Sequence, residues 1–156
     1  MPTTARAFVK ASLLYLGAGA ILGALLFIQR WIPLDTGLLA LRESHVQCVV
    51  VGWLTQLILG VAWWLFPPLP AGHWLRSRAP ERRGQFLRGS EPLFWATFIA
   101  LNAGILLRAI CAPLHVWTQI TFFEVLAGIS GIFLLAAAAT FLFNMWGRVR
   151  ALGQGS

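Results

Sequence analysis

The side chain with the clearest chemical potential is His45, which begins a run of about 20 apolar residues. Gly52, Gln56 and Gly60 follow at four-residue spacing, and they share one face of a helix with His45. A neutral imidazole can ligate haem iron, and a face of small residues leaves room for a flat macrocycle. The alternative is a histidine at the water interface that ligates nothing, and the residues alone leave both interpretations open.

Three more side chains are expected at the same end of the molecule as His45. His115 follows the third apolar run, where it is either a second axial ligand or a solvated turn histidine. Arg42 and Arg108 can hold haem propionates, because a guanidinium matches a carboxylate bidentately. For Arg42 the alternative is an arginine whose charged head reaches the aqueous interface.

Two opposite charges lie inside apolar runs, Arg108 in the third and Glu124 in the fourth. Unpaired charge is expensive in a membrane, so we expect the two to pair across consecutive helices. A carboxylate at that depth could instead contact a proton or a quinol. Gln56 and Asn102 are expected to hydrogen-bond between helices.

The composition is that of a membrane protein. Hydrophobic residues make up 58% of the chain and charged residues 11%, and the mean hydropathy is +0.75. The net charge of +7 comes from basic residues between apolar runs. This placement indicates membrane topology signals, and it argues against a nucleic-acid partner. Cys48 and Cys111 lack CxxC spacing and are expected to be ordinary small apolar residues.

These features predict an all-α, integral membrane four-helix bundle that forms a single domain over residues 1–156. The expected spans are residues 8–29, 45–66, 92–111 and 116–143. Residues 37–43 are expected to form a short helix at the membrane surface. Ala112 and Pro113 are expected to break the third span, and Asn144–Ser156 to form a basic tail.

The lysines and arginines predict how the bundle is oriented. Four spans place both termini on one side, together with nine of the twelve basic residues, and leave three on the other. The positive-inside rule then puts both termini in the cytoplasm of a bacterial-type inner (plasma) membrane.

Ser44–Pro67 carries the one specific resemblance to a known family. His45 begins the helix, Gly60-Val61-Ala62-Trp63-Trp64 follows fifteen residues later, and Pro67 ends it. This pattern resembles the second transmembrane helix of haem-copper oxidase subunit I, a family that includes cbb-type oxidases and nitric oxide reductases. The resemblance implies that His45 is an axial ligand of a low-spin haem. The whole chain looks like short four-helix relatives of that subunit, equivalent to one of its four-helix arcs.

The helices that bear the second axial histidine, the copper ligands and the active-site haem ligand in that family have no counterpart here. We therefore expect b-type haem, no copper, and no complete oxidase or nitric oxide reductase activity from the chain alone. The expected function is electron transfer or O2/NO sensing, and the alternative is a haem-free accessory or structural subunit of a respiratory membrane complex. A homo-oligomer or a complex with another membrane subunit is expected, with the His45 face at the contact.

Overall fold

The computed structural model describes residues 1–32, 36–66, 69–70, 86–87 and 89–150. Most of the chain between the second and third predicted spans, and the last six residues of the predicted tail, lie outside this range. Within it, four helices are long and apolar enough to span a membrane. This finding confirms the predicted all-α class and indicates a multi-pass membrane protein with lipid contact.

The second spanning helix is built from four consecutive pieces, and the other three are single α-helices. A pair of two-residue strands, β1 and β2, runs antiparallel beside the bundle. In chain order the elements are α1 (Thr3–Trp31), η1 (Thr36–Ala40, 3₁₀), α2 (Leu41–Val46), η2 (Gln47–Thr55, π), α3 (Gln56–Leu65), β1 (Leu69–Pro70), β2 (Phe86–Leu87), α4 (Glu91–Thr118) and α5 (Thr121–Arg150).

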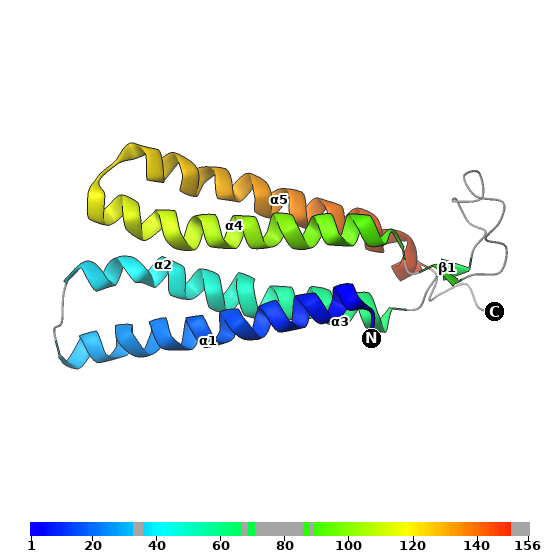
Figure 1. The fold of residues 1–156 in the computed structure, drawn as a ribbon, viewed down its shortest axis with the longest axis horizontal. Coiled ribbons are helices and arrows are strands. Elements are labelled where there is room, and N and C mark those ends of the chain that lie inside the picture. Colours follow the sequence, from blue (N-terminus) through cyan, green and yellow to red (C-terminus); the bar gives the residue numbers. More distant parts are fainter. Residues whose placement is uncertain (33–35, 67–68, 71–85, 88, 151–156) are drawn as a thin grey trace.

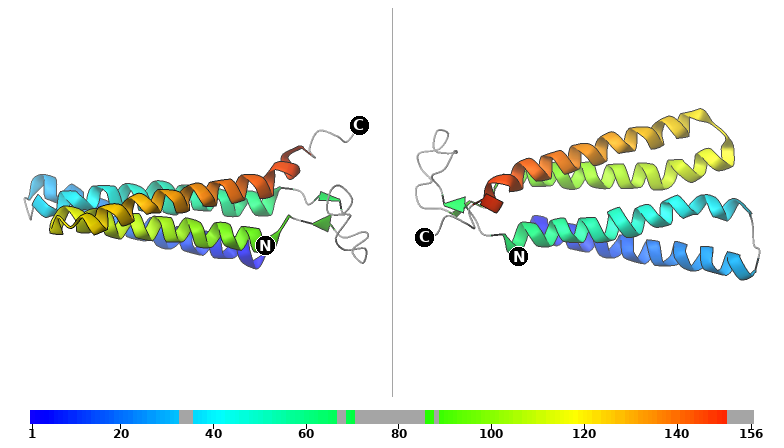
Figure 2. Two further views of the ribbon diagram at one scale, coloured as in Figure 1. Left: turned by 90° about the horizontal axis from the view of Figure 1, so that it is seen from above. Right: turned by 180° about the vertical axis from the view of Figure 1, so that it is seen from behind.

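The helices form two antiparallel hairpins that lie side by side (Figure 1). One pairs α1 with the η1–α3 helix, and the other pairs α4 with α5. The start of α1 and the end of α5 lie at the same end of the bundle, here called the terminal end (Figure 1 and Figure 2). The opposite end, where α4 turns into α5, is called the turn end.

Aromatic rings join the hairpins near the terminal end. Phe94 of α4 stacks on Phe8 of α1 at a centroid distance of 4.3 Å and on Trp63 of α3 at 4.2 Å. All three side chains are buried, and Leu101 and Ile105 continue this core along α4. Stacked aromatic pairs bury large apolar areas and add about 0.5–1.5 kcal/mol beyond burial.

The prediction that Ala112 and Pro113 break the third span is wrong, because α4 continues through both to Thr118. Proline has no N–H, so the carbonyl four residues earlier, that of Ala109, loses its intrahelical donor. The Ser44 hydroxyl of α2 donates to this carbonyl over 2.6 Å. A neighbouring helix thus supplies the missing hydrogen bond, which is how proline is tolerated inside membrane helices. The helix ends instead at Thr118, and the next residue, Gln119, has a left-handed backbone with φ of +57°.

The predicted surface helix over residues 37–43 is also wrong, because this segment extends the second spanning helix. The apolar helix runs continuously from Gly37 to Leu65. At the turn end, the indole N–H of Trp117 donates to the Gly37 carbonyl over 2.8 Å and ties η1 to α4. The four apolar residues 37–40 (GLLA) therefore lengthen the second spanning helix.

The predicted basic tail is helical as far as Arg150, and one of its arginines is buried inside the bundle. Arg148 is 0% exposed and donates to the carbonyls of Trp63 and Phe66. Its guanidinium also lies 5.1 Å from the centroid of the Trp63 ring. The last carbonyls of a helix have no intrahelical donor, and a cation is favoured at that end. Arg148 therefore caps the C-terminus of α3.

We predict that Arg148→Met lowers the stability of the protein in detergent by about 1.5–3 kcal/mol, the usual range for a hydrogen bond to a charged group. Arg30→Met is the matched control, because Arg30 is an exposed arginine in the last turn of α1. Thermal unfolding followed by circular dichroism measures both. Equal melting temperatures for the two variants would contradict the capping role.

Candidate functional site

His45 lies in the last turn of α2 and is partly buried against α1. Its Nδ1 lies 2.8 Å from the carbonyl oxygen of Gly19. A carbonyl can only accept a hydrogen bond, so Nδ1 carries a proton, and in the neutral imidazole Nε2 is then the nitrogen with a free lone pair. Metal-ligating histidines are oriented in this way, with one ring nitrogen donating to a carbonyl and the other facing the metal.

The imidazole packs directly on the backbone of α1. A Cβ atom at Gly23 would lie 2.8 Å from Cε1 of His45 and 3.2 Å from its Nδ1. Any larger residue at Gly23 must therefore displace the ring. Gly19 and Gly23 together fix both the position and the tautomer of His45.

The predicted haem face behind His45 is filled by side chains of α1. A Cβ at Gly52 would lie 2.5 Å from Cγ of Tyr15, and one at Gly60 would lie 2.7 Å from Cβ of Phe8. Gly52 and Gly60 therefore accept aromatic side chains in small-to-large packing. The expectation that the Gly52–Gln56–Gly60 face leaves room for a macrocycle is corrected, since Tyr15 and Phe8 occupy that space.

The two amide side chains expected between helices behave differently. Asn102 of α4 accepts a hydrogen bond from the Tyr15 hydroxyl over 3.0 Å, which confirms its interhelical role. Gln56 is completely buried, and neither its Oε1 nor its Nε2 has a hydrogen-bond partner among the described residues. Tyr15, the only tyrosine in the chain, contributes to both packing and hydrogen bonding, and no motif around it marks this role.

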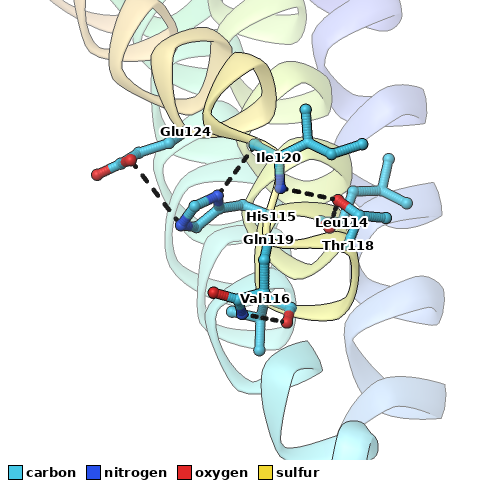
Figure 3. A network of polar contacts seen from close by, with 7 residues as sticks. All are labelled: Leu114, His115, Val116, Thr118, Gln119, Ile120 and Glu124. Atoms are coloured by element: carbon cyan, nitrogen blue, oxygen red, sulfur yellow. Dashed lines mark hydrogen bonds and ion pairs between the residues drawn. The ribbon is translucent and has the colours of Figure 1, made fainter.

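His115 lies in the last turn of α4 and not in a connection, because α4 continues beyond Pro113. Its Nδ1 donates to the carbonyl of Ile120 over 3.2 Å, and its Nε2 lies 3.9 Å from a carboxylate oxygen of Glu124 (Figure 3). His115 thus engages the start of α5, whereas His45 engages α1. The two candidate ligand histidines of one chain therefore contact different helices.

The predicted Arg108–Glu124 pair is wrong. Arg108 pairs with Glu43 of α2 at 3.5 Å, and Glu124 pairs with His115. Because α4 continues to Thr118, Arg108 lies about 15 Å along the helix from its C-terminal end. Glu124 lies in the first turn of α5, too near the turn end to meet Arg108. Arg42, the other candidate propionate ligand, is exposed on α2.

No protein-family model matches the chain, and no curated protein or solved structure matches it either. The resemblance to haem-copper oxidase subunit I therefore rests on the residues of Ser44–Pro67.

The ion pairs of the structure predict a specific pattern of coupling. Arg108→Gln combined with Glu43→Gln should cost less stability than the sum of the single changes, by about 0.2–1 kcal/mol for this partly exposed pair. Arg108→Gln combined with Glu124→Gln should be additive, because these side chains have different partners. A double-mutant cycle on thermal stability measures both, and coupling between Arg108 and Glu124 alone would contradict the assignment.

Proposed function

We propose that this chain is a haem-binding membrane protein related to haem-copper oxidase subunit I, acting in electron transfer or O2/NO sensing. The observation that carries the proposal is the 2.8 Å contact between Nδ1 of His45 and the Gly19 carbonyl. In the neutral form of this partly buried imidazole, Nε2 is then the nitrogen with a lone pair, which is what a haem ligand requires.

The residues of the chain fit a haem at His45 but not along the face behind it. His45 would hold the haem iron through Nε2, and the Gly19 carbonyl accepts the hydrogen bond from Nδ1. Tyr15 and Phe8 fill the glycine face, so the ring plane cannot lie there. Arg42, exposed one turn before His45, is available to a propionate at the aqueous edge. A b-type haem bound here would supply an iron that carries one electron or binds a diatomic gas.

A second axial ligand, in this proposal, comes from outside the chain. His115 is turned toward Glu124 and Ile120, at the start of α5. A second copy of the chain, or another membrane subunit, would complete a six-coordinate site. Gly52 and Gly60 pack against α1 of the same chain, so they are not available for contact with that partner.

A haem-free accessory subunit of a respiratory complex is the second candidate function. It is favoured by the filled glycine face, because Tyr15 and Phe8 leave no room for a macrocycle at Gly52 and Gly60. Under this function the Gly19–His45 hydrogen bond fastens two helices and has no further role. Protein purified from haem-replete cells separates the two, because only the haem protein has a Soret band.

We predict that His45→Ala abolishes the Soret band while the four-helix fold survives, because alanine offers no donor to the iron. Gly23→Ala should also weaken haem binding, since the new Cβ displaces the imidazole. Gly17→Ala is the matched control on the same helix, because its Cβ meets nothing within 4 Å and the gain in helix propensity is the same. Absorbance spectra and circular dichroism measure all three.

His115→Ala should leave the spectrum unchanged if the second ligand comes from another chain. Conversion from six- to five-coordinate iron by His115→Ala would overturn that assignment. Wild-type protein without any Soret absorbance would instead favour the accessory subunit.

We also propose that both termini face the cytoplasm of a bacterial-type inner membrane. The common end of α1 and α5 in the bundle and the nine-to-three distribution of basic residues support this orientation. Reporter fusions at Gly72 and Ser156 should both give a cytoplasmic signal. A periplasmic signal at either position would refute the topology.

A further inference from the structure

Gln56 is the most unusual buried side chain of the described bundle. It is 0% exposed, and both polar atoms of its amide are buried without a protein hydrogen-bond partner among the described residues. It lies about 14 Å from the end of α3, well inside the span. A buried amide in an apolar medium is strongly disfavoured unless it is hydrogen-bonded. A lipid or a partner chain cannot reach it, so a partner must be small enough to sit within the bundle.

Polar side chains of two other helices lie near the level of Gln56 along the bundle. Tyr15 packs on Gly52 and Phe8 packs on Gly60, and this antiparallel register places Ser12 of α1 opposite Gln56. Ser12 is also completely buried. One turn further toward the turn end, the Tyr15 hydroxyl donates to Asn102 of α4. Hydroxyl and amide groups from three helices therefore gather at one level of the core.

A second glutamine extends these polar groups toward the turn end. Gln47 is 8% exposed, and its Nε2 is buried without a hydrogen-bond partner in the described part of the chain. It begins the π-helix η2, which ends one residue before Gln56. Each residue of a π-helix advances less around the axis than in an α-helix, so these nine residues make about two turns and keep both glutamines directed inward. Ser44 and His45 lie one turn further toward the turn end.

The opposite direction is closed by rings. Phe8, Phe94 and Trp63 form a continuous stack between the level of Gln56 and the terminal end. All three rings are buried. Among the described residues, the buried polar side chains of Thr4 and Arg148 lie on the terminal side of this stack, so the rings separate them from Gln56.

We propose that Gln56 and Gln47 bind internal water, and that the water forms a file open to the turn end beside His45 and closed by Phe8, Phe94 and Trp63. Water suits the site because a carboxamide has two donors and an acceptor, and one water molecule can both donate and accept. Buried water typically makes about three hydrogen bonds to such groups. The proposal does not depend on haem.

Radiolytic hydroxyl-radical footprinting tests the file, because bound water generates the radical next to the side chain that it oxidises. The haem-free protein in nanodiscs is exposed to X-rays, and oxidation of Tyr15 is quantified by mass spectrometry. We expect Tyr15 to be oxidised in the wild type and to lose this oxidation in Gln56→Met, which has similar volume and no amide. Thr97→Val is the control, because Thr97 is equally buried and its hydroxyl already bonds to Leu93 and Thr140. It should leave Tyr15 oxidation unchanged.

The direction in which Gln56→Met changes the melting temperature is an independent test of bound water. If Gln56 is hydrogen-bonded to water, Gln56→Met lowers the melting temperature, whereas removing an unpaired amide raises it. A higher melting temperature, or Tyr15 oxidation that is absent in the wild type or unchanged in Gln56→Met, would overturn the proposal.

The wild type alone provides a last check, which stands even if the variants fail to fold. Water-edited solid-state NMR on ¹³Cζ of the single tyrosine should show rapid transfer from water. A transfer as slow as that to the buried Phe94 ring would exclude the file.

Discussion

Backbone hydrogen bonding in an apolar medium is the constraint on which this structure depends. Inside a bilayer every N–H and C=O must find a partner within the protein. Where the chain departs from a regular helix, a side chain from another helix supplies the missing donor. Ser44 does so for the carbonyl freed by Pro113, and Arg148 does so at the end of α3. His45 is different, because it adds a second donor to the Gly19 carbonyl inside the regular helix α1, and this hydrogen bond joins two helices.

The register between α1 and the η1–α3 helix is set by fitting large groups against glycines. His45 packs on Gly23, Tyr15 on Gly52 and Phe8 on Gly60. These contacts place the imidazole, the buried amide of Gln56 and the aromatic stack along one seam. A shift of one residue between these two helices would move all three side chains away from their glycines. The position of His45 therefore depends on contacts along the whole helix.

Hydropathy was sufficient to predict the four helices, because an apolar run of that length has few alternatives in a membrane. Hydropathy failed at Pro113 and at Arg148. There the local structure depends on a hydrogen bond to a residue far away in the sequence. The ion pairs were mispredicted because α4 continues beyond Pro113 to Thr118. This places Arg108 several turns from the end of α4, whereas Glu124 lies close to that end. Periodicity correctly placed Gly52, Gln56 and Gly60 on one face, but it could not say that Tyr15 and Phe8 fill it.

Arg148 also sets an order of events during synthesis. It is made 85 residues after Trp63, whose carbonyl it caps. The first hairpin therefore leaves the ribosome and enters the membrane long before its own cap exists. During that interval the end of α3 depends on water or lipid headgroups for its hydrogen bonds. Only when the last turn of α5 has been synthesised can Arg148 cap the end of α3. The last helix therefore completes the hydrogen bonding of a hairpin that was inserted earlier.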